Sequence, residues 1–154
     1  KIAKVDVVMK KIFLLSFILM MTFLSACGSN NDNEPFTWVL EKDRLVESGG
    51  IEDYVAQLQN EQPDYRPELT EFRGYNVFTV SEGMKMVVVS TGLSDKTLEF
   101  TGADVSENNT TILVKEVNQE SEEENSYILI GIEEIKGELT VFNENGDEFT
   151  AYEE

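Results

Sequence analysis

Histidine is absent from the 154 residues of this sequence, and cysteine and tryptophan each occur once. Without histidine, Ser-His-Asp and Cys-His catalytic arrangements are excluded, the commonest general base is lost, and the usual zinc ligand sets cannot form. The single Cys27 cannot form an internal disulfide or a thiolate metal site, so packing must stabilise the fold. Carboxylates, tyrosines, lysines and hydroxyl groups remain for any chemistry.

Basic residues are also scarce: 12 Lys and Arg stand against 30 Asp and Glu, for a net charge of −18. Residues 1–26 hold four of the lysines and one of the aspartates, so the remaining 128 residues carry 29 acidic and eight basic side chains, a net charge near −21. Nucleic acid and anionic lipid are therefore poor direct partners. We interpret the acidity as a solvated surface, with binding of cations or of a basic partner as the alternative.

A targeting signal occupies the start of the chain. We take Met9 as the translation start; Lys10 and Lys11 follow it, and then come the apolar run Ile12–Leu24 and small residues. A charged n-region, a short h-region and a small-residue cleavage site are typical of a secretory signal helix that is removed, so residues 1–26 are predicted to be a signal peptide. The 13 positions of the apolar run fall short of the roughly 20 that span a bilayer.

The end of this signal, Leu24-Ser25-Ala26-Cys27, resembles the bacterial lipobox. The resemblance implies that Cys27 receives a diacylglyceryl group by thioether linkage and that a dedicated peptidase cuts between Ala26 and Cys27. Two acyl chains, at roughly 0.8 kcal/mol per buried methylene, give durable anchoring. The chain is thus expected to be lipid-anchored at the outer face of the cell membrane. The alternative is an ordinary signal peptide that happens to end in a cysteine.

A polar segment follows the predicted anchor. Residues 28–34 read Gly-Ser-Asn-Asn-Asp-Asn-Glu and show no apolar periodicity, so residues 27–34 are predicted to be a lipidated tether. Seven such residues have a root-mean-square length of about 15 Å. The folded part is therefore expected to work close to the membrane surface.

An N-terminal extension with one helix is predicted for residues 35–67. Phe36, Trp38 and Leu40 alternate with other residues, which indicates a strand. Apolar residues at the i, i+3, i+4, i+7 spacing predict the only helix, which begins at Ile51. The stripe consists of Ile51, Tyr54, Val55 and Leu58. Pro63 and Pro67 bracket a connector that we expect to be extended and to end the extension.

Residues 68–154 are predicted to form a β-rich domain, a small antiparallel sandwich or partial barrel. The apolar run Met86–Val89, which contains β-branched residues, is expected in a central strand that is buried on both faces. The last hairpin is predicted around Asn145-Gly146, which supplies the positive φ angles of a tight turn. The predicted strands are Tyr75–Val80, Met84–Ser90, Thr97–Phe100, Thr110–Val117, Tyr127–Ile132, Leu139–Phe142 and Glu148–Tyr152.

Three stretches, Lys85–Gly92, Leu98–Val105 and Thr110–Val117, resemble a domain family found at the C-terminus of an accessory subunit of a bacterial surface protease complex. The likeness covers about half of the chain after Cys27. The family places a Thr-Gly-Gly-Tyr turn and later prolines after the first strand; here Leu93–Thr97 stands in place of that turn, and no proline follows Pro67. The resemblance implies a non-catalytic accessory module that supports assembly of a partner protein.

Several residue groups are candidate sites. Glu120 and Glu122–Glu124 could gather Ca²⁺, although such a run is more often a solvated loop. Met84 and Met86 could form an adaptable surface, although a strand face explains them as well. Aromatic side chains could stack on a sugar or peptide, although in a small domain they usually build the core. These are Trp38, Tyr65, Tyr75 and Phe78.

The resulting hypothesis is a membrane-anchored lipoprotein that acts as a non-catalytic binding or accessory assembly module. We expect it to be no enzyme, to need no cofactor and no metal, and to bind an envelope protein rather than nucleic acid. One alternative is a lipoprotein that binds a cation or a small ligand. The other is a wall glycan hydrolase that uses two carboxylates, for which 29 acidic residues leave the pair undetermined.

Overall fold

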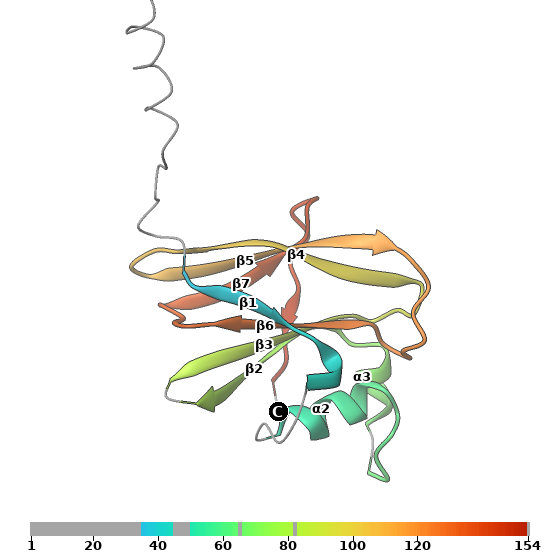
Figure 1. Ribbon diagram of the computed structural model, residues 1–154. Helices are drawn as coiled ribbons and strands as arrows, with labels where there is room; N and C mark the ends of the chain where they lie inside the picture. The colour runs from blue at the N-terminus through green and yellow to red at the C-terminus, as the bar shows by residue number, and fades with distance from the viewer. Residues whose placement is uncertain (1–34, 45–49, 65, 82, 154) are drawn as a thin grey trace, which may run out of the picture. The chain divides into compact units, whose positions relative to one another are not determined.

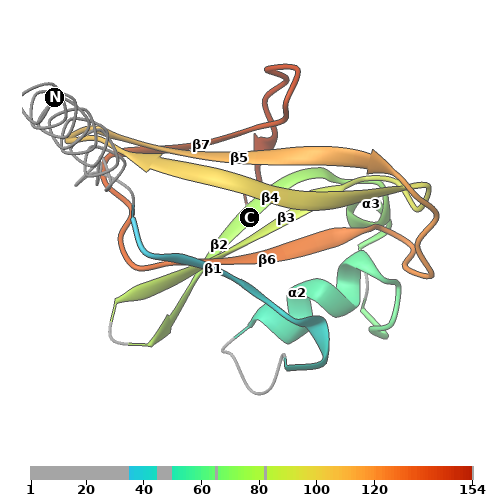
Figure 2. The same cartoon turned by 45° about the horizontal axis from the view of Figure 1, so that its top comes forward.

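Two β-sheets stacked face to face make up most of this computed structural model, which describes residues 35–44, 50–64, 66–81 and 83–153. Figures 1 and 2 show the sheets as separate layers, with the helices on the far side of the larger sheet. The predicted class, a mainly β sandwich, is confirmed. Sheet A has the strand order β1 (Thr37–Leu40), β6 (Tyr127–Ile132), β3 (Met84–Thr91), β2 (Arg73–Ser81) and β8 (Thr150–Ala151); sheet B has the order β4 (Lys96–Val105), β5 (Asn109–Asn118) and β7 (Glu138–Phe142).

Most neighbouring strands run antiparallel, but the two last strands do not. Strand β7 pairs parallel with β5, and β8 pairs parallel with β2. Parallel neighbours cannot be joined by a tight turn, so each of these strands returns to its sheet after a long connection. The C-terminal segment therefore adds a strand to both sheets.

The centre of sheet A is formed by β3 and β6, which are buried on both faces. Val87 and Val89 of β3 point toward sheet B, whereas Met86 and Val88 belong to the cluster on the opposite face. A strand covered on both sides needs apolar residues at every position rather than at alternate ones. The prediction of a central, two-sided strand at Met86–Val89 is confirmed.

The core between the sheets, called the inner core below, is mainly aliphatic. Side chains from both sheets interdigitate there, and most are fully buried. The inner core comprises Tyr75, Val87, Val89, Leu98, Ile112, Val114, Ile128, Ile130, Ile132, Val141 and Phe149.

The other face of sheet A is covered by helix α2 (Ile51–Leu58), which confirms the predicted helix and its apolar stripe. Ile51, Tyr54 and Leu58 are buried against the sheet. Gly50 precedes the helix with a φ of 95°, a conformation that glycine adopts at little cost. We call the resulting cluster the outer core. It comprises Ile51, Tyr54, Leu58, Leu69, Met86, Val88, Tyr127 and Leu129.

The prediction that a single helix occurs and that the connector stays extended to Pro67 is wrong. Pro67 opens a second helix, α3 (Pro67–Thr70), after Arg66 in an extended conformation. Proline fits the first turn of a helix because its missing N–H has no partner to lose there. A 3-10 turn, η2, also occurs at Lys42–Arg44.

The predicted last hairpin is only partly formed. The turn at residues 143–147 is present. Of the two residues that were expected to have a positive φ, Gly146 has a φ of 83°, whereas Asn145 does not have a positive φ. One antiparallel bridge joins Phe142 to Glu148, after which the two arms pair with different sheets. The side-chain oxygen of Asn143 instead holds the turn by accepting the N–H groups of Asn145 and Asp147 at 3.0 and 2.9 Å.

The predicted extension at residues 35–67 supplies β1 and α2 to the sheet formed by the later strands, because β1 pairs with β6 from Thr37↔Ile132 to Leu40↔Leu129. The described residues belong to one compact unit. The predicted signal helix, the lipobox, the tether and Tyr65 lie outside the described residues. No helix within the described ranges has the length and apolarity that crossing a membrane requires.

Candidate functional site

A pocket of about 340 Å³ opens beside helix α2, and we call it the α2 pocket. Its walls come from four segments: one side of α2 with the glycine before it, helix α3 with the residue before it, the middle of β2, and the residue after β8. Segments far apart in the sequence therefore meet around one hollow. The lining residues are Gly50, Asp53, Tyr54, Gln57, Arg66, Leu69, Asn76, Phe78 and Tyr152.

Aromatic rings form one wall of the α2 pocket. The ring of Tyr54 lies 5.5 Å from that of Phe78 and 5.4 Å from that of Tyr152, centroid to centroid, and both pairs are tilted. Phe72 supports Tyr152 from behind in an edge-on contact at 5.6 Å. Such tilted and edge-on pairs are the favoured geometries of aromatic packing, so the wall is held in place.

The polar groups of the pocket are unequally satisfied. Arg66 donates a hydrogen bond from its guanidinium to the hydroxyl oxygen of Tyr152, and Gln62 donates to Asp53 at 3.3 Å. The hydroxyl group of Tyr54 is buried and has no hydrogen-bond partner within the described ranges. Burial, and then the proximity of Tyr152, raise the pKa of Tyr54, so this hydroxyl keeps its proton and can donate.

A ligand that suits this arrangement has a flat apolar face for the aromatic wall and hydrogen-bonding groups around its rim. Asn76, Gln57, Asp53 and Arg66 offer both donors and acceptors there. Pockets for small molecules commonly combine apolar walls with a few polar groups that fix orientation. The α2 pocket can therefore bind a small polar molecule, whereas Asp53 is the only carboxylate for chemistry among the described residues that line it.

A second pocket of about 320 Å³, the β8 pocket, brings two carboxylates together. Glu138 at the start of β7 and Glu148 before β8 both line it. Their negative charges, together with burial as the main cause, raise the pKa of Tyr75, whose hydroxyl donates to the carbonyl of Leu139 at 2.6 Å. The other lining residues are Phe149, Thr150 and Ala151.

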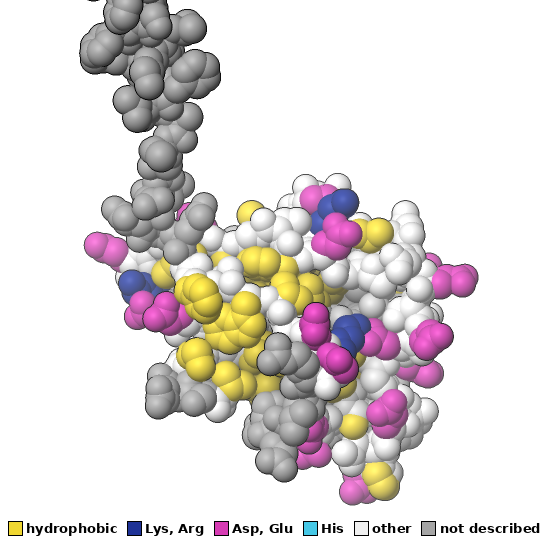
Figure 3. Space-filling model, viewed as in Figure 1, with side chains coloured by type: hydrophobic (Ala, Val, Ile, Leu, Met, Phe, Trp, Pro, Cys, Tyr) yellow, Lys and Arg dark blue, Asp and Glu magenta, His cyan; other side chains and the backbone are white. Residues whose placement is uncertain are grey.

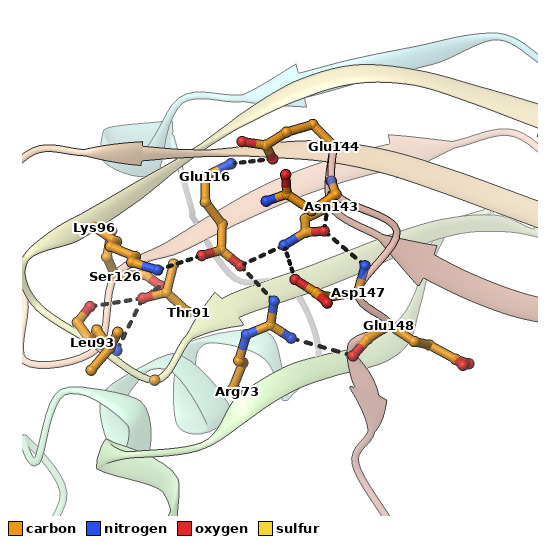
Figure 4. Close-up of polar contacts among 12 residues, drawn as sticks. Arg73, Thr91, Leu93, Lys96, Glu116, Ser126, Asn143, Glu144, Asp147 and Glu148 are labelled. Carbon is orange, nitrogen blue, oxygen red and sulfur yellow. Dashed lines mark hydrogen bonds and ion pairs between the residues drawn. The ribbon is translucent and has the colours of Figure 1, made fainter.

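A charge cluster centred on Glu116 joins the two sheets (Figure 4). The carboxylate of Glu116 on β5 accepts from Arg73 of β2 at 2.5 Å and from Lys96 of β4 at 2.8 Å. The amide of Asn143 also donates to it at 3.3 Å, and the Arg73 guanidinium lies 3.9 Å from the ring centre of Phe149. Every charged group in the cluster thus has a partner in the protein.

Hydrogen bonding controls the charge of Glu116. Burial opposes its ionisation, but the hydrogen bonds from Lys96, Arg73 and Asn143 outweigh burial and hold the pKa of this carboxyl below its ordinary value. The hydrogen bond to Glu116, and then the negative charge of that carboxylate, raise the pKa of Lys96. The cluster therefore stays ionised near neutral pH, and we interpret it as a clamp between the sheets rather than as a site for a ligand.

Asn125 is a second polar centre, and sequence reasoning missed it. This residue is fully buried, and its amide nitrogen donates to the carbonyls of Leu69 and Phe72 at 2.9 and 3.0 Å. Its side-chain oxygen accepts the N–H of Gly92 at 2.8 Å. The sequence offers one signal, which is that an asparagine lies two residues before the apolar strand β6, but that signal is common to many loops.

The acidic run that was weighed as a calcium site is spread out in the structure. Glu123 pairs with Lys42 at 2.5 Å, and the lysine also lies 4.2 Å from the ring centre of Tyr127. Glu122 and Glu124 are exposed. Within the described ranges, no three acidic or cysteine side chains are close enough to hold a metal ion.

The aromatic and methionine candidates mostly pack into the fold. Tyr75 belongs to the inner core and Met86 to the outer core, and Trp38 and Phe78 pack against the outer core. Phe78 also lines the α2 pocket. The structure thus places two of the candidate aromatic residues in pockets, Phe78 in the α2 pocket and Tyr75 in the β8 pocket. It adds Tyr54 and Tyr152 to the α2 pocket, and the sequence did not single these out as site residues.

Comparison with known proteins gives one informative result. The sequence is 40% identical over 137 residues to the uncharacterized protein YycS of Bacillus subtilis (strain 168), and the match covers 86% of this chain and 89% of that protein. No protein-family model matches the chain, and no solved structure is significantly similar to it.

Proposed function

We propose that this chain, which belongs to the same family as YycS of Bacillus subtilis, is a lipid-anchored envelope lipoprotein whose β-sandwich is a non-catalytic binding module. The proposal has two parts, an address and an activity. The address rests on the sequence around Cys27, and the activity rests on the α2 pocket.

The address is supported by the order of features in residues 9–27: two lysines, a short apolar run, and Leu24-Ser25-Ala26-Cys27. The only cysteine of the chain stands at the one position where the lipobox pattern requires it. A net charge near −21 after Cys27 gives the folded part no general attraction to anionic lipid, so covalent lipid is the means of attachment that the sequence offers.

The activity is supported by a single observation, the buried hydroxyl of Tyr54 without a partner beside an aromatic-walled pocket. Leaving a buried hydroxyl unpaired costs about 1–3 kcal/mol, and a ligand that accepts its hydrogen bond would recover part of that cost. We propose that the ligand is a small polar molecule with a flat apolar face, such as a sugar ring of an envelope glycan.

Mass spectrometry of the N-terminal peptide tests the address. We expect the mature chain to begin at Cys27 and to carry a diacylglyceryl group, and we expect Cys27→Ala to shift the protein from the detergent phase to the aqueous phase. Ser29→Ala, two residues further along the tether, serves as the matched control and should still partition into detergent. A mature chain with an unmodified sulfur, or with Lys10 and Lys11 still attached, would overturn the address.

Calorimetric titration with disaccharide fragments of wall glycan tests the activity. We expect binding that Arg66→Ala weakens at least tenfold, because the guanidinium contributes donors to the pocket rim. Arg73→Ala is unsuitable as a control because it breaks the clamp, so Asn118→Ala on the exposed end of β5 is the matched variant. If no fragment binds, or if both variants bind alike, the pocket is not a glycan site.

A protein partner with a basic surface is the other form that the binding function can take. The acidic surface would steer such a partner, so its affinity should fall as the salt concentration rises. Isolation of the lipidated protein from its own membrane at low and high salt, followed by identification of bound proteins, tests this. A partner retained equally at both salt concentrations would argue against charge steering.

The β8 pocket favours one second candidate, a carboxylate-based glycan hydrolase, because Glu138 and Glu148 line the same hollow. A turnover assay on wall glycans decides the matter. Activity that is lost in both Glu138→Gln and Glu148→Gln would establish a hydrolase, and absence of turnover in the wild-type protein would leave the binding function.

A further inference from the structure

The edge of the outer face of sheet A at β1 carries an apolar surface that we call the β1 patch, formed by Phe36 and Trp38. Register places Trp38 beside Gly131, Gly131 beside Met86, and Met86 beside Phe78, so the patch continues the row of side chains that leads to the outer core. Figure 3 shows apolar side chains gathered over the part of the surface where β1 runs.

The two aromatic residues of the β1 patch are exposed to different degrees. Phe36 is 66% exposed and does not belong to the side chains packed against the outer core, whereas Trp38 is half-buried against that core. Their rings contact each other at 5.6 Å between centroids. A large apolar ring left in water beside a second ring marks a surface suited to an apolar partner.

Gly131 holds Trp38 in this position. A Cβ atom at residue 131 would lie 2.0–2.4 Å from the indole ring, so the ring rests directly on the backbone of β6. Because the sheet fixes the ring, the patch is pre-organised and loses little conformational entropy when it is covered.

The position of the patch along the chain identifies what covers it. Phe36 follows Cys27 by nine residues, and the seven tether residues have a root-mean-square length of about 15 Å. We infer that the β1 patch docks onto the outer leaflet of the membrane that holds the lipid of Cys27. This inference rests on the proposed lipid anchor and adds an orientation, in which β1 faces the lipid.

Two physical effects decide whether such docking occurs. Tryptophan and phenylalanine side chains favour the boundary between lipid and water. Because the short tether holds the folded part next to the bilayer, the effective concentration of lipid is high, and a patch with a low intrinsic affinity for lipid can still dock. The acidic surface opposes it by repelling anionic lipid. Docking should therefore be stronger on zwitterionic than on anionic vesicles, and on anionic vesicles it should increase with salt.

The single tryptophan makes the contact measurable. A chain that begins at Cys27 contains the whole compact unit of residues 33–154, and its only thiol can be coupled to a maleimide lipid in phosphatidylcholine vesicles. With bromine atoms on the acyl chains near the glycerol, we expect the fluorescence of Trp38 to fall at least twofold relative to vesicles without bromine. The uncoupled chain mixed with the same vesicles should show no such fall.

Two variants separate patch contact from chance proximity. Phe36→Ser should restore most of the fluorescence, whereas Leu113→Ser, at a 43% exposed leucine on sheet B, should leave the quenching unchanged. A tether lengthened by 20 Gly-Ser residues before Pro35 should reduce the quenching by lowering the effective concentration. Thermal unfolding of each variant verifies that it is folded.

The outcomes distinguish this inference from the anchor on which it rests. Quenching in the coupled chain, with an unmodified Cys27 in the cell, would support the docking surface and refute the lipid anchor. A lipidated Cys27 without quenching, in the coupled chain or in the lipoprotein purified from its membrane, would refute docking. Equal quenching in the wild type and Phe36→Ser would refute the patch as the contact.

Discussion

The two faces of sheet A differ in composition and in how completely they are covered. The inner core consists mainly of valine and isoleucine and is sealed between two sheets. The outer face carries tyrosine, tryptophan, phenylalanine and methionine, and one helix of eight residues and one of four residues lie against it. The α2 pocket and the β1 patch are both on this outer face.

This difference between the faces suits the inner core to stabilising the fold and the outer face to binding. Branched aliphatic side chains fill the space between sheets at high density and have few accessible rotamers, so the inner core fixes the fold. Tyrosine and tryptophan side chains tolerate partial exposure because they combine a large apolar area with a polar group. The outer face can therefore expose rings beside a pocket at little cost to the fold.

Substitutions at two neighbouring residues of β6 are expected to show the largest difference between the faces in the free energy of unfolding. Ile130 and Leu129 are both fully buried and contain the same number of carbon atoms, but Ile130 faces the inner core and Leu129 the outer core. We expect Ile130→Ala to cost about 4 kcal/mol in the free energy of unfolding and Leu129→Ala about 2.5 kcal/mol, because α2 can move into the space left on its side. Urea denaturation measures both, and equal or reversed costs would abolish the distinction.

Asn125 connects the outer core to the strands, and its substitution is expected to cause the next largest loss in the free energy of unfolding. Asn125→Ala leaves the carbonyls of Leu69 and Phe72 and the N–H of Gly92 without this partner, so we expect a loss of about 3 kcal/mol. The same change at the exposed Asn118 should lie within about 0.5 kcal/mol of the wild type. A loss at Asn125 no larger than that at Asn118 would show that the loop is held by its backbone alone.

Much of this architecture could be predicted because it depends on local patterns. The continuous apolar run Met86–Val89 indicates a strand that is buried on both faces, and the stripe beginning at Ile51 indicates a helix that is buried on one side. Helix α3 was missed because four residues carry no periodicity, and Pro67 was read as a break although it suits a first turn. The last hairpin was misread because the Asn145-Gly146 signal describes the turn and not the sheets to which its arms belong.

The site residues were less predictable because they meet only through tertiary structure. The sequence identifies Tyr54 as part of a helix stripe. Nothing local indicates that its ring packs against those of Phe78 and Tyr152, or that its hydroxyl is buried without a partner among the described residues. Similarly, Glu116 is one of 30 acidic residues, and only the meeting of β2, β4 and β5 selects it as the clamp. Cys27 was identified because its motif is continuous in sequence.

The clamp at Glu116 predicts a pH dependence of stability that involves both sheets but not the α2 pocket. The pKa of this carboxyl is lower in the folded than in the unfolded chain, so the clamp contributes fully above the ordinary value of 4.5, and its contribution is lost as the pH falls below 4.5 through the folded value. Glu116→Gln should cost about 2 kcal/mol at pH 7 and progressively less at lower pH.

Because many carboxylates titrate together in this chain, the difference between wild type and variant is the quantity to measure. Glu99→Gln is a matched control, since Glu99 also pairs with a lysine but at 3.5 Å on an exposed surface. Its cost should be small at every pH. A constant difference for Glu116→Gln between pH 7 and pH 3 would mean that this carboxyl does not titrate differently in the folded state.

The smallest expected effect on stability is also the most specific test of the contrast between the faces. Tyr54→Phe removes a buried hydroxyl that has no partner among the described residues, so the variant should be as stable as the wild type or more stable by up to about 1 kcal/mol. In the inner core, Tyr75→Phe should lower stability by about 1 kcal/mol, because the hydroxyl of Tyr75 donates to Leu139. Opposite signs for the same chemical change would show that the inner core is built for stability whereas the outer face keeps a donor available for a ligand. If Tyr54→Phe destabilises as much as Tyr75→Phe does, the Tyr54 hydroxyl already has a partner in solution and the α2 pocket loses its main support.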